Sequence, residues 1–400
     1  MRGDRVRSVR WLAATLIGVT LVAGCTAANG ATNSANSHDQ AVHAQAVKPV
    51  ARPATITSQP AVGTQAVSPS GVIATSVSDG TISTVALTSS TGTVIAGQLS
   101  PDKRTWTATE HLGYGKTYTW SGAALGMDGK TVSIAGSFTT VTPARQVSGQ
   151  LNVGDNQTYG IAMPVALTFS SPVSDEVAVE RALTVTTSVP TIGSWAWLDN
   201  KTVHWRPESY YAPGTAVTVT ANLYGVAVAP GVYGKADVSV NFTIGRSQVV
   251  QANTQTHRMV VITNGVQTSD FPASFGLDSD LGRNTHSGTH VVMGRSQTVF
   301  MTSVKYHYTN LEVHWAVRIS NNGEFIHAAP WSVAQQGRVN VSHGCVNLSN
   351  ANAIAYYNNV LVGDPVEITG SAIQLGAADG DYYDWTLTWA QWQAKSALAA

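Results

Sequence analysis

The sequence carries little charge, and this shortage excludes one class of partner. Only 12% of its 400 residues are charged, whereas soluble domains have about 25%. The 23 Lys and Arg residues equal the 23 Asp and Glu residues in number. The chain therefore lacks the basic surplus with which nucleic-acid-binding proteins neutralise phosphates, and we expect no nucleic-acid partner.

Long apolar runs are also lacking. The stretch from Trp11 to Ala23 follows a segment with several arginines and is shorter than the roughly 18 residues of a membrane-spanning helix. Residues 1–25 are therefore predicted to be a signal peptide. This segment ends in Val22-Ala23-Gly24-Cys25, which resembles the lipobox of bacterial lipoproteins. The resemblance implies lipidation of Cys25 and anchoring on the outer face of the cytoplasmic membrane, facing the cell wall. An ordinary cleavage site with an incidental cysteine is the alternative.

Cysteine is nearly absent, since the chain has only Cys25 and Cys345. With Cys25 lipidated, the exported part keeps one thiol and forms no internal disulfide. An exported protein that keeps an unpaired cysteine either buries it inertly or uses it chemically. Cys345 is thus the first candidate for a functional residue.

The composition predicts a mainly β protein with several domains. Its 36 glycines and its many Thr, Val and Ser residues favour strands over long helices, and 400 residues exceed the size of an ordinary single domain. Residues 26–68 are rich in small and polar residues with few large apolar side chains. Such a segment buries too little surface to fold, so it is predicted to be a disordered linker.

Residues 69–144 and 145–246 are predicted to form two tandem immunoglobulin-like β-sandwiches. Each contains short alternating segments separated by glycine-rich turns. A weak internal repeat, in which Ser137–Thr139 is echoed by Asn241–Thr243, supports this interpretation. The tryptophans of both units are interpreted as core residues rather than as platforms for sugar rings. These tryptophans are Trp106, Trp120, Trp195, Trp197 and Trp205.

Residues 247–370 are predicted to form a third, β-rich domain. Asn264-Gly265 and Asn322-Gly323 lie between apolar segments and are typical of hairpin turns. The second hairpin places His327 near the end of a strand. Ser349 is suited to cap a short helix that follows Cys345.

Residues 371–400 are predicted to be a C-terminal extension packed on this third domain. Thr388 and Gln391 have the spacing of a capping box, which predicts a short terminal helix. The tryptophans around it are interpreted as anchors rather than as carbohydrate ligands.

The densest chemical signal is the run from Ser342 to Asn347, which reads Ser-His-Gly-Cys-Val-Asn. A thiol attacks as its thiolate and so needs a base. The candidates are His343, which shares a face with Cys345 if this segment is extended, and His327 on the preceding strand. Gly344 allows backbone angles that aim amide N–H groups at a developing oxyanion. Asn347 lies on the same face again. Its side chain is suited to position a neighbouring group or to donate a hydrogen bond.

This run, preceded at a distance by His327, resembles the signature of the L,D-transpeptidase (YkuD) family. That signature is a His, a spacer, and then Ser/Thr-His-Gly-Cys-x-Asn. The wider chain is similar to the multi-domain members from bacteria with meso-diaminopimelate in their peptidoglycan. Those proteins carry two immunoglobulin-like domains, a catalytic β domain and a Trp-bearing C-terminal extension. The likeness is loose only in the first sandwich.

The resemblance implies a complete mechanism. Cys345 would attack the carbonyl of the third residue of a tetrapeptide stem and release D-alanine. The side-chain amine of meso-diaminopimelate on a second stem would then resolve the acyl-enzyme into a 3→3 cross-link. His327 would be the base, held by the backbone carbonyl of the next residue, which is Ala328 here and Ser in close relatives. His343 would be an orienting residue within the motif.

The resemblance also implies the ligands of the site. Carbapenem β-lactams would acylate the same cysteine, and no cofactor or metal would take part. The residues that would line or bind the substrate are Met301, Tyr308, Trp331, Ser342 and Asn347.

Several alternatives stay open at this point. Cys345 could be a buried, inert thiol, and the chain a non-catalytic wall-binding lipoprotein that works through its sandwiches. Within enzymes, water in place of an amine would make the chain an L,D-carboxypeptidase, because the motif does not distinguish acceptors. A zinc site at His286 and His290 is disfavoured, because the Ser-Gly-Thr between them argues against a helix and a general-base Glu is not evident.

Overall fold

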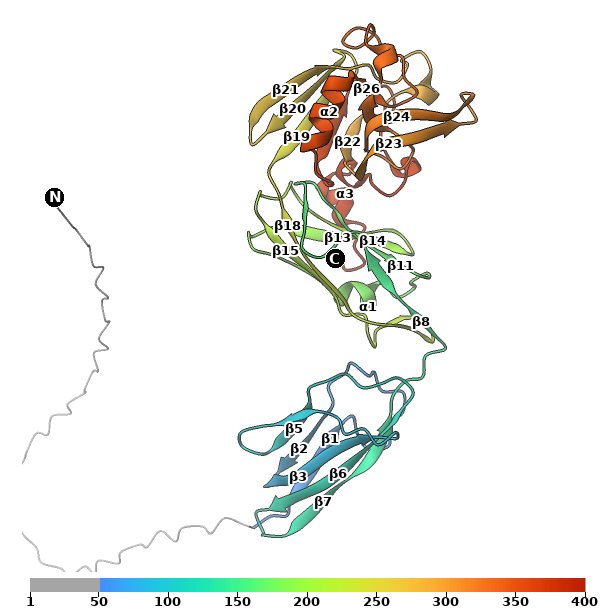
Figure 1. The fold of residues 1–400 in the computed structure, drawn as a ribbon. Coiled ribbons are helices and arrows are strands. Elements are labelled where there is room, and N and C mark those ends of the chain that lie inside the picture. Colours follow the sequence, from blue (N-terminus) through green and yellow to red (C-terminus); the bar gives the residue numbers. More distant parts are fainter. Residues whose placement is uncertain (1–50, 400) are drawn as a thin grey trace, which may run out of the picture. The chain divides into compact units, whose positions relative to one another are not determined.

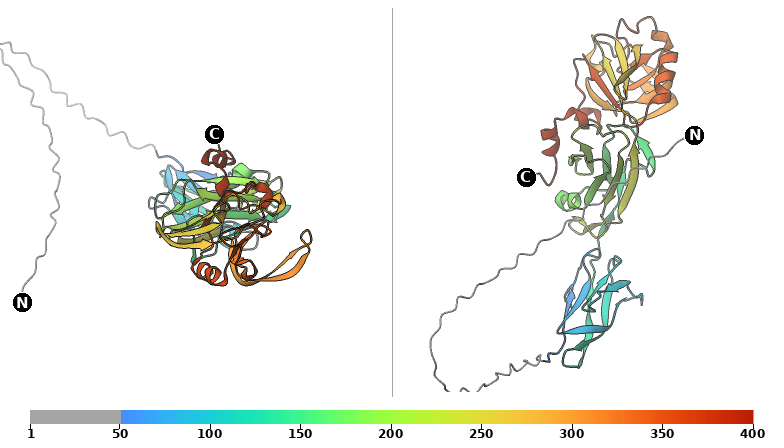
Figure 2. Two further views of the ribbon diagram at one scale, coloured as in Figure 1. Left: turned by 90° about the horizontal axis from the view of Figure 1, so that it is seen from above. Right: turned by 90° about the vertical axis from the view of Figure 1, so that its left-hand side faces the viewer.

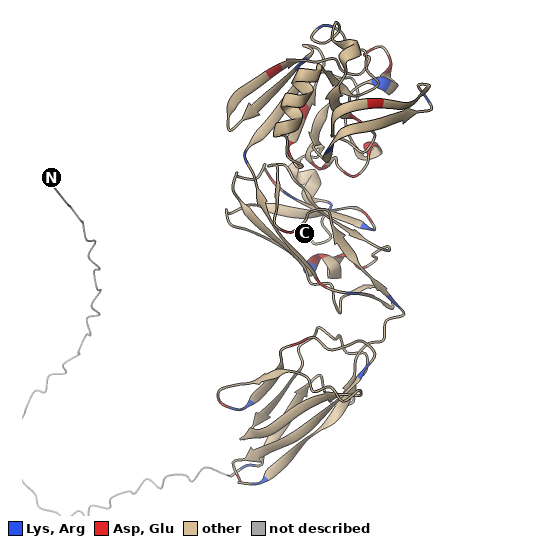
Figure 3. Cartoon of the chain, in the orientation of Figure 1, with Lys and Arg blue, Asp and Glu red and all other residues tan. Residues whose placement is uncertain are grey.

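The computed structural model describes residues 51–399 (Figure 1). The predicted signal peptide, Cys25 and the first part of the predicted linker lie outside the described residues. The prediction of a mainly β fold is confirmed, because most elements are strands and the helices are short. Among residues 51–399, no helix has the length and apolar character needed to cross a membrane. Charged residues are sparse along the described part of the chain (Figure 3).

The first immunoglobulin-like sandwich has two sheets, ordered β1-β2-β5-β4 and β3-β6-β7. In its core Trp106 and Trp120 meet edge to face with ring centroids 5.4 Å apart, and both are buried. The interpretation of these tryptophans as core residues is therefore confirmed. The strands are β1 Thr55–Gln59, β2 Ala74–Ser78, β3 Gly80–Ser89, β4 Gly97–Leu99, β5 Thr105–Ala108, β6 Thr117–Gly126 and β7 Thr131–Thr139.

The predicted linker extends too far, because strand β1 lies inside residues 26–68. β1 pairs antiparallel with β2 from Thr55 opposite Ser78 to Gln59 opposite Ala74. Its side chains alternate between exposed and half-buried, so backbone hydrogen bonds rather than apolar burial hold it to the sheet. A composition argument that counts large apolar residues misses such an edge strand.

The second sandwich has sheets ordered β10-β18-β15-β12 and β13-β14-β11-β9, with a small third sheet β16-β17-β8. Trp195, Trp197 and Trp205 are buried in it. Trp205 packs so closely on Gly193 that a Cβ there would lie 1.9 Å from the indole. The elements are β8 Arg145–Val147, β9 Gly149–Leu151, β10 Gln157–Tyr159, β11 Val165–Phe169, α1 Glu176–Arg181, β12 Leu183–Thr187, β13 Gly193–Asp199, β14 Thr202–Pro207, β15 Ala216–Ala221, β16 Ala227–Ala229, β17 Val232–Gly234 and β18 Val238–Ile244.

The third domain contains two sheets, ordered β21-β20-β19-β27-β22 and β23-β24-β25-β26. Helix α2 packs against β24 and β25 of the second sheet (Figure 1). The elements are β19 Gln248–Asn253, β20 Arg258–Thr263, β21 Val266–Pro272, η1 Leu281–Arg283, β22 Gly288–Val291, β23 Gly294–Ser303, β24 Tyr308–Arg318, β25 Phe325–Ala328, η2 Pro330–Ser332, β26 Val346–Leu348, α2 Asn350–Asn359 and β27 Pro365–Thr369.

In the third domain, the predicted hairpin turn, the predicted helix cap and the predicted strand of His327 are confirmed. Asn264 and Gly265 both have positive φ, at 51° and 80°, as the tight turn between β20 and β21 requires. The hydroxyl of Ser349 accepts the N–H of Asn352 at the start of α2. The predicted hairpin that carries His327 is the antiparallel pair β24 and β25.

The C-terminal extension packs on the second sandwich as well as on the third domain, which corrects the prediction of packing on the third domain alone. The indole of Trp385 donates to the carbonyl of Ala162 at 2.8 Å, and that of Trp392 donates to the carbonyl of Ser194 at 2.9 Å. The guanidinium of Arg206 lies over both rings, a cation–π contact that the apolar pattern of the tail did not reveal. Figure 2 shows the red C-terminal segment beside the green strands.

The extension contains η3 Ala377–Asp379, η4 Asp384–Thr386 and α3 Trp389–Gln393. The predicted capping box is present, because Thr388 and Gln391 bond reciprocally at the start of α3. The prediction of a short terminal helix is therefore confirmed, but Trp392 anchors it to the second sandwich and not to the third domain as predicted.

We predict that Trp392→Ala lowers the free energy of unfolding by about 3–5 kcal/mol, because removing a buried indole leaves a cavity. Trp392 is 0% exposed, whereas Trp331 is 57% exposed and serves as the matched control. Urea titration followed by circular dichroism measures both variants, and Trp331→Ala should change the value by less than about 0.5 kcal/mol. Equal losses in the two variants would contradict the anchoring role of Trp392.

Candidate active site

The candidate nucleophile and the candidate base come from neighbouring parallel strands. In the register of β25 and β26, His327 lies opposite Asn347 and Ile326 opposite Val346. Cys345 directly precedes β26 and therefore lies level with the start of β25. Parallel strands need a long connection, and residues 329–345 supply it.

The loop before Cys345 is held by hydrogen bonds that its own sequence supplies. Gly344 has a φ of +123°, a conformation that strains any residue with a Cβ. The Ser342 hydroxyl donates to the carbonyl of Cys345 at 2.6 Å and accepts the N–H of Gly344 at 3.2 Å. The Thr285 hydroxyl donates to the carbonyl of Gly344 at 2.7 Å. The N–H of Gly344 itself is engaged by Ser342, and the expectation that this glycine lets the backbone aim amide N–H groups at an oxyanion stays a prediction.

The residues predicted to act together face one cavity of about 320 Å³. Gly344 lines an adjoining cavity instead. Thiol and imidazole thus share an open space, rather than being sealed in separate parts of the core. The predicted residues that line the first cavity are His327, His343, Cys345, Met301, Tyr308, Trp331, Ser342 and Asn347.

The imidazole of His327 is fixed in one tautomer. Its Nδ1 lies 2.8 Å from the backbone carbonyl of Ala328. A carbonyl can only accept, so Nδ1 carries the proton and Nε2 is left as the acceptor. Burial lowers the pKa of His327 to about 4, which keeps the ring neutral and able to accept a proton. The methyl group of Ala328 in place of a hydroxymethyl does not affect this contact, because only the backbone takes part.

The Cys345 thiol and the His327 imidazole each hydrogen-bond to a backbone carbonyl, so the role of His327 as the base stays a prediction. Burial of the sulfur raises the pKa of Cys345 to about 12, the nearby Glu324 carboxylate raises it further, and the Phe325 backbone N–H opposes both. The sulfur donates its weak hydrogen bond to the carbonyl of Gly323 at 3.8 Å. Desolvation disfavours the thiolate more than the neutral imidazole can repay.

His343 faces the β23–β24 hairpin. Its exposed ring lies 4.7 Å from the ring of Tyr306 and 5.4 Å from that of Tyr308, between centroids. Burial and the positive charge of Arg283 lower its pKa. Tyr308 is near enough to Cys345 for the thiolate to raise its pKa, after burial, which is the larger cause. The β23–β24 hairpin therefore lines one side of the cavity at Cys345, and His343 packs against this hairpin.

Three of the predicted substrate-binding residues have contacts of their own. The hydroxyl of Ser342 is engaged within the loop, and the amide of Asn347 donates to the hydroxyl of Ser332 at 3.2 Å. The Ser342 side chain thus holds the backbone of Cys345 and the Asn347 side chain holds the side chain of Ser332, and the role of both in binding stays a prediction. Trp331 is exposed, and its ring centroid lies 6.2 Å from that of His327.

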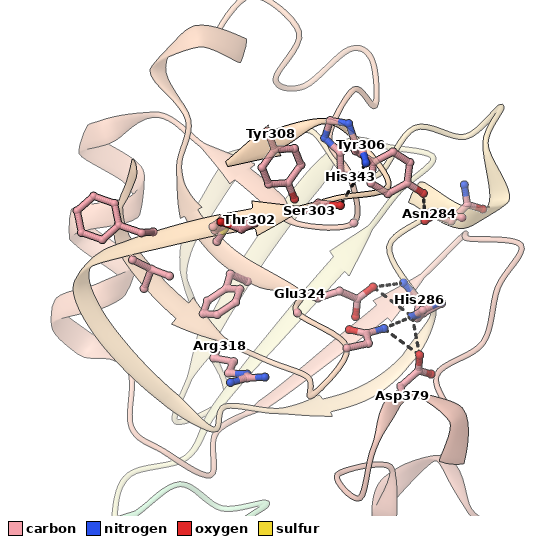
Figure 4. A pocket seen from close by; sticks show the side chains of 18 residues that line it. Asn284, His286, Thr302, Ser303, Tyr306, Tyr308, Arg318, Glu324, His343 and Asp379 are labelled. Carbon is pink, nitrogen blue, oxygen red and sulfur yellow. Dashed lines mark hydrogen bonds and ion pairs between the residues drawn. The ribbon is translucent and has the colours of Figure 1, made fainter. Parts of the chain in front are cut away.

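A second cavity of about 500 Å³ adjoins the first (Figure 4). The two share Met301, Tyr306, Tyr308 and His343 as a common wall. The second cavity is lined by charged and polar groups that sequence reasoning missed. These are Arg318, Asn322, Glu324, His286 and Asp379.

Some of these missed residues had a signal in the sequence. Tyr306 lies two positions before Tyr308, and alternate residues near a hairpin tip share a face. Glu324 follows the predicted Asn322-Gly323 turn, where a lone carboxylate is unusual beside an apolar strand. Asp379 lies far along the chain, and no local pattern connects it to the site.

His286 and His290, the pair weighed for zinc, both lie near the carboxylate of Glu324, whereas His307 and His314 lie in the β23–β24 hairpin. Nε2 of His290 lies 2.9 Å from the backbone carbonyl of His286, and His314 is on β24 with Nδ1 3.2 Å from the Thr298 hydroxyl. His307 is in the tip of the β23–β24 hairpin. Within residues 51–399, no group of three His, Cys, Asp or Glu side chains has the geometry of a metal site.

Comparison with known proteins gives one family. Residues 247–368 match the YkuD L,D-transpeptidase catalytic domain, and residues 64–227 match a bacterial Ig domain. The chain is 50% identical over 348 residues to L,D-transpeptidase 5 of Mycobacterium tuberculosis, covering 86% of this chain and 77% of that protein. It is 37% identical over 335 residues to L,D-transpeptidase 2 of the same organism, covering 82% and 81%. A solved L,D-transpeptidase in complex with imipenem is 35% identical and covers 55% of this chain and 97% of its own, with a TM-score of 0.48.

We predict that alkylation of Cys345 by iodoacetamide accelerates about tenfold per pH unit from pH 6 to pH 9, because the reactive thiolate fraction rises below a pKa near 12. Mass spectrometry of the Cys345 peptide measures the rate. His327→Gln should leave this rate nearly unchanged, because the two side chains are not paired at rest. A plateau between pH 5 and pH 8 would instead reveal a thiolate–imidazolium pair and contradict the neutral resting state.

Proposed function

Because the chain belongs to the L,D-transpeptidase family, we propose that it forms 3→3 cross-links in peptidoglycan through a thioester on Cys345. The observation that carries the proposal is the shared cavity of Cys345 and His327. In that cavity the Ala328 carbonyl fixes Nδ1 of the imidazole, so Nε2 is free to take a proton. The proposed donor is a tetrapeptide stem, and the proposed acceptor is the side-chain amine of meso-diaminopimelate on a second stem.

In the acylation step, the sulfur of Cys345 attacks the amide carbonyl carbon of the third stem residue. Nε2 of His327 removes the thiol proton as the C–S bond forms, so the thiolate exists only during the reaction. The tetrahedral intermediate then expels D-alanine, whose nitrogen takes the proton back from His327. A neutral thiol and a neutral imidazole at rest suit this concerted transfer, because neither charge has to be stabilised before the substrate excludes water.

In the second step, the neutral acceptor amine attacks the thioester carbonyl. His327 takes a proton from the attacking nitrogen and returns it to the departing sulfur, which regenerates the thiol. The two adjoining cavities support this sequence, since they meet at a common wall beside Cys345 and leave room for two stems. The hairpin residues Met301, Tyr306 and Tyr308 of that wall would contact both substrates.

We predict that purified protein incubated with disaccharide-tetrapeptide yields a cross-linked dimer and free D-alanine, and that Cys345→Ala yields neither. His327→Gln, which keeps a polar group of similar size, should lower the rate by about 10²–10⁴-fold, as expected for loss of a general base. Liquid chromatography with mass spectrometry measures the products.

Two other outcomes of this assay would change the proposal. Tripeptide without dimer would show that water resolves the thioester, as in an L,D-carboxypeptidase. Full activity in Cys345→Ala would remove the acyl-enzyme altogether. A carbapenem serves as a second probe, because its strained carbonyl would be held by the same sulfur. The protein should gain the mass of one drug molecule at Cys345, and Cys345→Ala should gain none.

We also propose that the chain is exported and held at the outer face of the cytoplasmic membrane by lipid on Cys25. The support is the sequence alone, a basic segment and a short apolar stretch ending in Val-Ala-Gly-Cys. The folded domains would then face the cell wall, where the stem peptides are.

We predict that the full-length chain expressed in a bacterial host incorporates labelled palmitate and sediments with membranes, because a lipidated N-terminal cysteine partitions into the bilayer. Cys25→Ser should abolish both, whereas Cys345→Ala should affect neither. Label in the Cys25→Ser protein would contradict the anchor.

A further inference from the structure

The C-terminal extension contacts a turn beside the candidate nucleophile. The turn is Asn321-Asn322-Gly323, between β24 and β25, and the contacting segment is Asp379-Gly380-Asp381, which we call the acidic clamp. The Asn322 amide donates to the Asp379 carboxylate at 2.9 Å. The Asn321 amide donates to the Asp381 carboxylate. Consecutive residues of the turn are thus paired with alternate residues of the extension.

Gly380 of the acidic clamp allows the clamp to lie close to this turn. Gly380 has a φ of +111°, and a Cβ placed there would lie 2.4 Å from the Cβ of Asn321. A side chain at this position would therefore clash with the turn and strain its own backbone. Close approach of the two segments depends on glycine, with a carboxylate on each side.

The Asn322 amide is fully used in holding the turn. Its second N–H points at Nδ1 of His286 at 2.7 Å, and its oxygen accepts the hydroxyl of Ser320. The neighbouring Glu324 carboxylate accepts the backbone N–H of His286 at 2.8 Å. Figure 4 shows His286 and Asp379 converging on this point, with Glu324 beside them. The turn itself is exposed, so these side-chain bonds take the place of packing.

Besides burial, which is the larger cause of its raised pKa, the sulfur of Cys345 is subject to groups of this turn. The Gly323 carbonyl accepts the S–H at 3.8 Å. The Phe325 backbone N–H and the Glu324 carboxylate, on the next two residues, also act on the thiol. A carbonyl favours the thiol and an N–H favours the thiolate, so a small shift of residues 323–325 changes both the direction and the reactivity of the S–H.

We propose that the acidic clamp is a positioning element for catalysis, which fixes residues 323–325 against Cys345 through Asn321 and Asn322. The extension would thereby contribute to the rate through the turn rather than by contact with the reacting atoms. This inference rests on the proposed role of Cys345 as the nucleophile. Asp379 and Asn322 are its central pair, and Asp381 with Asn321 forms a second link.

The test compares Asp379→Ala, Asn322→Ala and the double variant in the carbapenem acylation and cross-linking assays. Each single variant should lower the rate constant per active site on the order of 10-fold, since misplacement of a reacting group carries costs of this kind. The double variant should be no slower than the slower single variant, because both remove the same link. The apparent KM should change little, and the pH dependence of Cys345 alkylation should shift in both single variants.

Controls separate positioning from loss of fold. Asp379 also accepts the N–H of Gly376, so Asp379→Ala could loosen the extension, but Asn322→Ala leaves that bond intact. Asp270→Ala removes a carboxylate paired with Arg258 on the β20–β21 hairpin and should keep the full rate. Stoichiometric carbapenem labelling counts the folded sites in every variant.

Two results would overturn the inference. One is unchanged rate constants per labelled site in both single variants, while Cys345→Ala is inactive. The other is strictly additive losses in the double variant, which would mean that Asp379 and Asn322 act separately. Activity in Cys345→Ala would instead overturn the proposed function itself, so the two failures are distinguishable.

Discussion

The structure around the site depends on one contact, the bond from Nδ1 of the His327 imidazole to the carbonyl of Ala328. It fixes the tautomer, leaves Nε2 of a cavity-lining residue as the acceptor, and needs no particular side chain at position 328. The parallel pairing of β25 with β26 then brings the loop of Cys345 alongside. A base with one available nitrogen and a nucleophile on the adjacent strand are thereby held by backbone, the least mobile part of the fold.

Burial gives this pair an unusual resting state. Many cysteine enzymes keep a thiolate beside an imidazolium, but here desolvation raises the pKa of Cys345 to about 12 and lowers that of His327 to about 4. Both shifts favour the neutral forms, which makes the reactivity of the pair depend on the geometry of the bound complex. Elements that contact only the surroundings of the sulfur, such as the turn at Gly323 and the β23–β24 hairpin, are therefore placed to influence the proposed chemistry.

Sequence patterns correctly predicted the turns, the helix caps and the buried tryptophans. The Asn264-Gly265 turn, the Ser349 cap, the Thr388–Gln391 capping box and the buried tryptophans depend on residues close in the chain or on strand periodicity. The family resemblance named the residues that line the nucleophile's cavity. Strand β1 was wrongly assigned to the predicted linker. It is held mainly by backbone hydrogen bonds to β2, which the amino-acid composition of a segment does not reveal.

The sequence by itself determined the β architecture, the order of the domains and the identity of the reactive run from Ser342 to Asn347, because each is encoded in neighbouring residues or in a dense motif. Tertiary structure alone decided the surroundings that raise the pKa of Cys345, the packing of the extension on the second sandwich, and the meeting of Asp379 with Asn322. Desolvation and long-range pairing depend on which distant segments surround a group, and no local pattern carries that information.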